Sequence, residues 1–119
     1  MDSLILKREH YLYLKLFGKT ETQEYKNILQ KSNEELSKYK NSKMLLDLND
    51  MDFSGVTNRK KVVFAMILFD ILKLNTKKQI AVLVKQKCFD ETIKKYADLR
   101  NYGLGVFHTE DNAITWLMK

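Results

Sequence analysis

Apolar residues recur along the chain with two different periods, which predicts a protein that contains both strands and helices. Short apolar runs that alternate or are continuous, bounded by polar turns, are typical of strands. The first two runs flank Glu9-His10 and predict an N-terminal hairpin, and Gly18 ends the second run. The predicted strands are residues 3–8, 11–17, 43–48, 79–84 and 104–108.

Segments with helical spacing separate the later strands. The first follows Thr20-Glu21-Thr22-Gln23, a capping box in which the Thr and Gln side chains satisfy backbone groups at a helix start. Its predicted buried face consists of Tyr25, Ile28, Leu29, Ser32, Leu36 and Tyr39. Two further helices are predicted at Gly55–Leu74 and at Phe89–Arg100, the latter with Gly103 as its stop. The last helix follows Thr109 as its cap and packs through Ala113, Ile114, Trp116 and Leu117.

The order of these elements, ββαβαβαβα, predicts an α/β fold in a single domain that spans residues 1–119. Alternation of strand and helix after a hairpin implies right-handed parallel crossovers. We expect a mixed, mostly parallel sheet of about five strands, with an N-terminal hairpin and about four helices packed on it.

Composition and charge limit the function classes. The chain has 119 residues and a formal net charge of +6, but its basic residues are mostly Lys and are scattered, so we do not predict nucleic-acid binding. Residues 1–20 are interrupted by charges and show no secretory signal. The longest apolar run, Val62–Leu72, is too short to cross a bilayer. With the single Cys88, these features predict a cytoplasmic protein without membrane insertion.

No metal or cofactor is predicted. Asp47, Asp50 and Asp52 lie close together in the sequence, but the loop lacks the ligand spacing and bidentate Glu of an EF-hand, and Asx turns explain Asp50 and Asp52 as well. Cys88 has no neighbouring Cys or His that would support a zinc site.

The segment after the third predicted strand contains the main candidate site. Asp47 ends that strand, Ser54, Gly55 and Thr57 lie at the predicted start of the next helix, and Arg59 follows. Ligands of α/β proteins bind at such connections, and the free N–H groups of a first helical turn favour an anion or a phosphoryl group. The structural alternatives are that Ser54 caps the helix and that Asp47 braces the loop.

A second group of candidates comes from parallel pairing. Asp47, Lys85 and His108 follow or end three predicted strands, and the carboxyl ends of parallel strands meet at one edge of a sheet. We expect them to form a polar pocket there, with ordinary surface polarity as the alternative.

The second predicted helix is apolar on nearly all sides over residues 62–72. Such a helix is either buried beneath other helices or partly exposed as a patch for a homodimer or another protein partner. A third interpretation is that it covers a small apolar ligand.

Three segments resemble the SpoIIAA-like branch of the STAS domains, the sulphate transporter and anti-sigma factor antagonist domains. They are Leu45-Leu46-Asp47-Leu48, Phe53-Ser54-Gly55 and the ending Val106-Phe107-His108-Thr109-Glu110-Asp111-Asn112-Ala113-Ile114-Thr115-Trp116-Leu117. The resemblance implies a regulatory or ligand-binding module. It also implies a phosphorylatable Ser within Asp-Ser-Ser-Gly, which matches Asp52-Phe53-Ser54-Gly55 except that Phe53 precedes Ser54.

Two functional hypotheses follow. The first is a non-catalytic regulatory module whose loop and helix start, from Asp47 to Arg59, recognise a protein partner, a phosphoryl group or a small anion. The alternative is a carrier of a small apolar or lipid-like ligand held beneath the second helix. An enzyme would rest on Asp47, Lys85 and His108 without any nucleophile–base spacing, so we predict no enzymatic activity.

Overall fold

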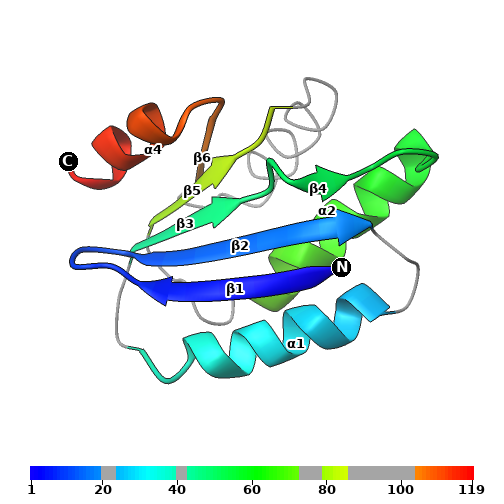
Figure 1. Cartoon of the computed structure of the whole chain (residues 1–119), viewed down its shortest axis with the longest axis horizontal. Helices are drawn as coiled ribbons and strands as arrows, with labels where there is room; N and C mark the ends of the chain where they lie inside the picture. Colours follow the sequence, from blue (N-terminus) through cyan, green and yellow to red (C-terminus); the bar gives the residue numbers. More distant parts are fainter. Residues whose placement is uncertain (20–23, 40–42, 73–78, 86–103) are drawn as a thin grey trace.

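The computed structural model of the chain describes residues 1–19, 24–39, 43–72, 79–85 and 104–119 (Figure 1). The strands are β1 (Asp2–Lys7), β2 (Leu12–Lys19), β3 (Lys43–Asp47), β4 (Met51–Asp52), β5 (Gln79–Leu83) and β6 (Leu104–Phe107). The helices are α1 (Glu24–Leu36), α2 (Asn58–Leu72) and α4 (Glu110–Leu117). The helix expected over Phe89–Arg100, its stop Gly103, the capping box at residues 20–23 and Cys88 lie outside the described residues.

The strands form one mixed sheet in the order β1-β2-β3-β5-β6. The hairpin β1-β2 is antiparallel, and β2-β3, β3-β5 and β5-β6 are all parallel. The predicted fold class is therefore confirmed. The short strand β4, which pairs with Gly18 and Lys19 at the end of β2, was not predicted because two residues produce no periodic signal.

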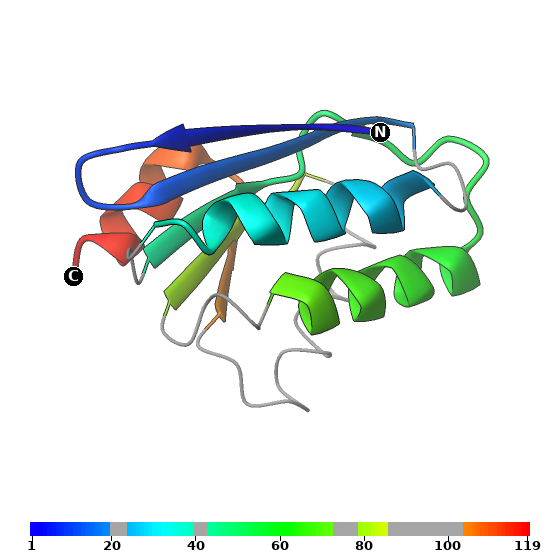
Figure 2. The same ribbon diagram turned by 90° about the horizontal axis from the view of Figure 1, so that it is seen from below.

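Helices cover both faces of the sheet and create two cores (Figure 2). Leu12, Leu14 and Leu16 alternate along β2 and pack toward α1 and α2, whereas Tyr11 and Tyr13 lie on the side of α4. Every residue of β3 after Lys43 is buried, as expected for a parallel strand between helices.

Helix α1 buries the predicted stripe. Tyr25, Leu29, Ser32 and Leu36 are buried, and Tyr39, just beyond the helix, packs against the same core. The spacing of three and four residues places these side chains on one side of the helix. Residues of the opposite face, including Lys31 and Glu34, are exposed.

Helix α2 begins at Asn58 and not at Gly55, so the predicted start is wrong. Gly55 has φ +73°, a left-handed conformation that no α-helix contains. The helix is amphipathic in practice: Phe64, Ala65, Leu68 and Phe69 are buried, whereas Val62, Val63 and Met66 are exposed. The helix is therefore buried on one side and exposes apolar side chains on the other, and the partner patch stays a prediction.

Helix α4 begins as predicted. The Asn112 N–H donates to the Thr109 hydroxyl at 3.4 Å, and Glu110 and Asp111 occupy the first turn, where negative charge suits the helix dipole. Ala113 and Leu117 are fully buried against the sheet. At the other end, Lys43 Nζ of β3 donates to the Leu117 carbonyl at 2.5 Å, which ties the helix terminus to the sheet.

Candidate functional site

The connection from β3 to α2 starts at a buried carboxylate. Asp47 accepts a hydrogen bond from the Tyr13 hydroxyl at 2.5 Å and another from the Asn49 N–H at 3.0 Å. The first bond joins β3 to β2, and the second forms an Asx turn that starts the loop. Asp47 therefore braces the connection in this structure. Burial, followed by the Asp47 carboxylate, raises the pKa of Tyr13 well above its usual range.

The acidic loop is tied to β2 by an ion pair. Asp50 lies 2.5 Å from Lys15 Nζ, and the hydrogen bond from Lys15 holds the pKa of Asp50 below its usual range. The Gly18 N–H also donates to the Asp50 carbonyl at 3.1 Å. Asp50 therefore makes an ion pair with a neighbouring strand, while Asp52 makes the Asx turn that was expected for both acids.

The segment Phe53-Ser54-Gly55-Val56 is a tight turn. The Val56 N–H donates to the Phe53 carbonyl at 3.0 Å, and Gly55 supplies the left-handed φ that a type II turn needs at its third position. The Ser54 N–H donates to Asp52 Oδ1 at 2.9 Å. The Ser54 side chain and this N–H together hold the pKa of Asp52 below its usual range.

Thr57 is the residue that caps α2. Its Oγ1 accepts from the Lys60 N–H at 3.2 Å, and its carbonyl accepts the first helical bond, from the Lys61 N–H at 3.0 Å. Ser54 is therefore not the helix N-cap, because the turn at Gly55 separates it from the helix. Ser54 lies exposed at the turn, three residues before the cap.

The strand ends behave as parallel pairing predicts. Asp47, Lys85 and His108 lie at or just after the ends of β3, β5 and β6, whose ends are joined by Leu48 N–H to Leu83 C=O (2.8 Å) and Val84 N–H to Phe107 C=O (3.0 Å). His108 Nδ1 lies 3.0 Å from the Val84 carbonyl, which can only accept, so Nδ1 carries the proton. Lys85 and His108 are exposed, whereas Asp47 is buried.

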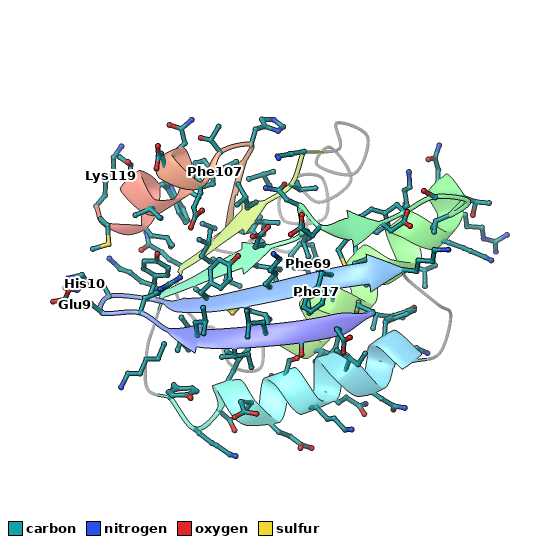
Figure 3. The ribbon with its side chains drawn as sticks, in the orientation of Figure 1. Glu9, His10, Phe17, Phe69, Phe107 and Lys119 are labelled. Carbon is teal, nitrogen blue, oxygen red and sulfur yellow. The ribbon has the colours of Figure 1, made fainter. Side chains whose placement is uncertain are left out.

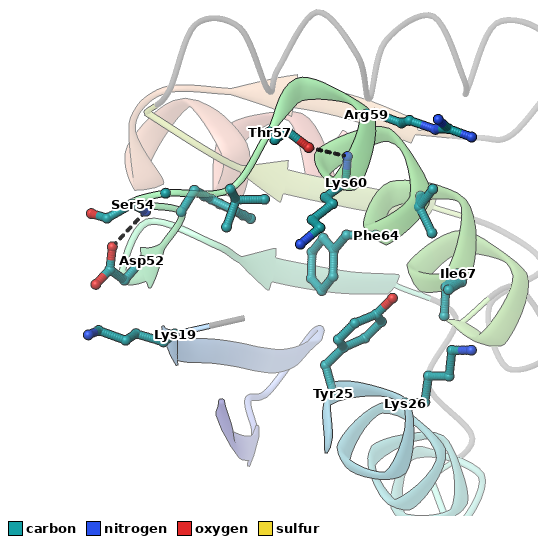
Figure 4. Close-up of a pocket in the computed structure, with 14 residues that line it drawn as sticks. Lys19, Tyr25, Lys26, Asp52, Ser54, Thr57, Arg59, Lys60, Phe64 and Ile67 are labelled. Carbon is teal, nitrogen blue, oxygen red and sulfur yellow. Dashed lines mark hydrogen bonds between the residues drawn. The ribbon is translucent and has the colours of Figure 1, made fainter. Parts of the chain in front are cut away.

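The other candidates line a groove on the side of the molecule where α1 and α2 meet the ends of β2 and β4 (Figure 4). The cavity volume is 720 Å³, and Ser54, Gly55, Thr57 and Arg59 all border it. Asp47, Lys85 and His108 are not among its lining residues. The candidates predicted from the sequence therefore fall into two groups at different places.

The groove combines an apolar wall with basic side chains. Tyr25, Phe64 and Ile67 supply apolar surface, and the rings of Tyr25 and Phe64 meet edge to face with centroids 5.3 Å apart. Its charged lining residues are Lys19, Lys26, Asp52, Arg59 and Lys60. Sequence reasoning missed Lys19, Tyr25 and Lys26, because nothing local indicates that the start of α1 faces the start of α2.

The described residues contain no cluster of His, Cys, Asp or Glu that could hold a metal ion. Within the same residues, no helix is long and apolar enough to span a bilayer.

Sheet order, helix placement and the groove together define a small α/β module with one basic, partly apolar recess. A SpoIIAA-like family model matches residues 11–118, and the chain belongs to this family. The resemblance predicted from the sequence is thus confirmed. No curated protein matches the chain.

Solved structures share this fold. One is described as an anti-sigma factor antagonist from Mycobacterium paratuberculosis; it has a TM-score of 0.65 and 13% identity, with 98% of this chain and 93% of that chain covered. An uncharacterized protein of the DUF3478 family with a SpoIIAA-like fold, from Shewanella loihica, matches with a TM-score of 0.63 and 16% identity over 97% and 91% of the two chains. The anti-sigma factor antagonist SpoIIAA in its unphosphorylated form matches with a TM-score of 0.53 and 14% identity over 98% and 96%.

Proposed function

We propose that this chain is a non-catalytic regulatory module that recognises a protein partner through residues 47–59. Membership of the SpoIIAA-like family and the likeness to proteins described as anti-sigma factor antagonists support a regulatory role. The observation that carries the proposal is that Ser54, Gly55, Thr57 and Arg59 are exposed together on a connection held by internal hydrogen bonds. A connection ordered before binding loses less conformational entropy when a partner docks. The cytoplasmic location predicted from the sequence is part of this proposal.

The charge at the start of α2 indicates what the partner surface contains. Arg59, Lys60 and Lys61 occupy the first turn, which has no acidic residue, although a helix N-terminus is stabilised by negative charge. This arrangement costs stability in the free protein. An acidic surface or a phosphoryl group on a partner would relieve that cost, so we infer that the partner is acidic at the contact.

We propose a module without catalytic activity because the Asp47 carboxylate is buried and already hydrogen-bonded. This carboxylate accepts from Tyr13 and Asn49, and Asp47 is 8% exposed. A general base must reach the proton that it removes, and Asp47 serves the fold instead.

Regulation by phosphorylation fits Ser54 better than Thr57. Both hydroxyls are exposed and hydrogen-bonded, but Thr57 Oγ1 caps α2 by accepting from the Lys60 N–H, whereas Ser54 lies in the turn outside the helix. A phosphoryl group on Ser54 would stand beside the Asp52 carboxylate, and the two negative charges would repel each other. We infer that phosphorylation opens the Asp52–Ser54 turn and changes the docking surface.

Site-specific cross-linking tests the partner surface. A photo-reactive residue placed at Ser54 in the host cell should yield one defined covalent adduct, and a matched probe at Glu34 on the exposed face of α1 should not. Arg59→Glu should remove the adduct at position 54. Adducts that form equally at both positions, or that survive Arg59→Glu, would contradict the proposed surface. Mass spectrometry of the wild-type protein purified from the host cell tests phosphorylation at Ser54.

A second candidate function, a carrier of a small apolar or lipid-like ligand, is favoured by the groove. Its wall of Tyr25, Phe64 and Ile67 with cations at the rim suits a molecule with an apolar body and one anionic end. A fluorescent fatty acid should then bind to the protein. The double variant Arg59→Glu, Lys60→Glu should bind the fatty acid more weakly, whereas its affinity for the neutral methyl ester should be unchanged. A probe that does not bind, or an effect of equal size on the ester, would exclude this function.

A further inference from the structure

Strand β1 forms one edge of the sheet and pairs only with β2 within the described part of the chain (Figure 1). The Arg8 N–H donates to the Tyr11 carbonyl at 3.0 Å. This bond shows which residues of β1 bond to β2 and which direct their backbone groups outward. In an antiparallel pair, residues bond to the neighbouring strand in alternation. The even-numbered residues of β1 therefore bond to β2, and Ser3, Ile5 and Lys7 direct their backbone groups away from the sheet.

The two faces of this edge differ in how they are covered. Helix α1 packs on β1 from one side, and Ile5 contacts the larger core there. On the other side α4 packs on β3, β5 and β6, so among the described residues it leaves β1 uncovered on that face (Figure 1). Leu4 and Leu6 point to that uncovered face and are 45% and 36% exposed. An open edge with exposed Leu side chains, without Pro or a bulge, is a template for pairing with another strand.

We propose that β1 pairs with β1 of a second copy of this chain, antiparallel, about a two-fold axis at Ile5. Both strands direct the backbone groups of their odd-numbered residues to the interface, so odd residues must lie opposite odd residues. With Ile5 opposite itself, Ser3 lies opposite Lys7 of the second copy. On the other face, Leu4 lies opposite Leu6.

The same register places Asp2 opposite Arg8, twice per dimer. Cross-strand pairs of opposite charge and of apolar side chains both stabilise a sheet. The two adjacent registers lose these matches, because centring on Leu4 places Asp2 opposite Leu6, and centring on Leu6 places Leu4 opposite Arg8. The strand is therefore complementary to itself in one register, which favours a second copy over an unrelated partner.

The proposed dimer interface would leave the groove accessible. None of the residues that line the groove belongs to β1. One continuous sheet would run through both copies and present two equivalent groove surfaces, which favours a bivalent partner. The proposal rests on the edge geometry alone and does not depend on the function of residues 47–59.

Charge reversal tests the register. In sedimentation equilibrium the protein should show a reversible monomer–dimer equilibrium. Asp2→Lys and Arg8→Glu, each alone, should weaken the dimer by about tenfold, because each replaces two attractive pairs with two repulsive ones. An equimolar mixture of the two variants should form a heterodimer in native mass spectrometry, because Lys at position 2 then faces Glu at position 8. Glu34→Lys on the exposed face of α1 and Lys38→Glu in the exposed turn after it are the matched controls and should change nothing.

Hydrogen exchange provides a readout independent of these variants. As protein concentration rises, the amides of Ser3, Ile5 and Lys7 should become protected, while the exchange of Leu4 and Leu6, already bonded to β2, should change little. A protein that stays monomeric at millimolar concentration would overturn the proposal. A dimer whose dissociation constant is unchanged by both charge reversals, and in which the amides of Ser3, Ile5 and Lys7 stay unprotected, would also overturn it.

Discussion

The Tyr13 hydroxyl donates a hydrogen bond of 2.5 Å to Asp47 Oδ2, from the second residue of β2 to the last residue of β3. Asp47 is buried and accepts a second hydrogen bond from the Asn49 N–H. This bond forms the first turn of the connection that leads to α2. One carboxylate thereby joins two parallel strands and starts the loop whose later residues border the groove. Figure 3 shows Glu9 and His10 at the exposed tip of the β1-β2 hairpin, from which β2 leads to Tyr13.

Replacing the donor should destabilise the fold. Tyr13→Phe leaves Asp47 with one donor fewer in a buried position and should lower the free energy of unfolding by about 1.5–3 kcal/mol, as for a lost hydrogen bond to a charged group. Urea unfolding followed by circular dichroism measures the change. Tyr39→Phe serves as the control, since that Tyr packs at the core margin and its hydroxyl makes no such hydrogen bond to the residues that the structure describes. Equal losses in both variants would contradict the role of the Tyr13–Asp47 bond.

The same bond should be visible in the alkaline pH dependence. The pKa of Tyr13 is raised in the folded state, first by burial and then by Asp47, so the folded protein holds this proton more tightly than the unfolded chain does. The corresponding stability is complete below the unfolded pKa of about 10 and is lost as the pH rises above it. Tyr13→Phe should therefore lose less stability across this range than the wild type. Tyr25, whose pKa burial also raises, contributes equally to both proteins and cancels in the comparison.

The cap of α2 should be Thr57 and not Ser54. Thr57→Ala removes the acceptor for the Lys60 N–H and should cost about 1 kcal/mol, whereas Thr57→Ser should retain most of the stability. Ser54→Ala, at an exposed turn position, should stay within about 0.5 kcal/mol of the wild type. Thermal or urea unfolding of the three variants distinguishes the positions, and a larger loss at Ser54 than at Thr57 would contradict the observed helix start.

Ser54 should nevertheless control the ionisation of its neighbour. The hydrogen bond from the Ser54 side chain is the largest cause of the lowered pKa of Asp52, and the Ser54 N–H adds to it. Ser54→Ala should raise that pKa toward its usual value without restoring it fully, because the N–H remains. An NMR titration of the Asp52 carboxyl carbon measures the shift, with Asp111 as an internal reference. An unchanged pKa would show that the side chain does not contact the carboxylate in solution.

Gly105 should resist substitution for a steric reason. A Cβ built there would lie 2.7 Å from the Phe107 ring and 3.3 Å from the indole of Trp116. These two rings pack with centroids 5.5 Å apart, so Gly105→Ala must displace them. We expect a loss of about 1–3 kcal/mol, as for overpacking, together with a change in Trp116 fluorescence. A variant with wild-type stability and emission would show that the rings move aside freely.

Local patterns were sufficient for much of the fold. The continuous apolar runs predicted β3 and β5, the three- and four-residue spacing predicted the buried face of α1, and Thr109 predicted the start of α4. Each of these features depends on residues a few positions apart, so burial of one face or a single capping bond is already encoded in their order.

The start of α2 shows where local information ends. Ser54 and Thr57 are both good caps by residue type. Phe53 decides between them, because its ring is buried against Phe64 at a centroid distance of 5.9 Å, which anchors the turn before the helix can begin. That contact joins the loop to the second turn of α2. Whether Ser54 or Thr57 caps the helix therefore depends on how the whole core packs.

By itself the sequence determined the strand and helix types, the mostly parallel order and the polar character of residues 47–59, because these follow from hydrophobic spacing and short-range hydrogen bonding. Only the tertiary structure decided that Asp47 is held by Tyr13, that Lys19 and Lys26 join Arg59 around one groove, and that β1 lies at one edge of the sheet. These relations join residues far apart in the chain, and they arise only when sheet order and helix packing bring those residues together.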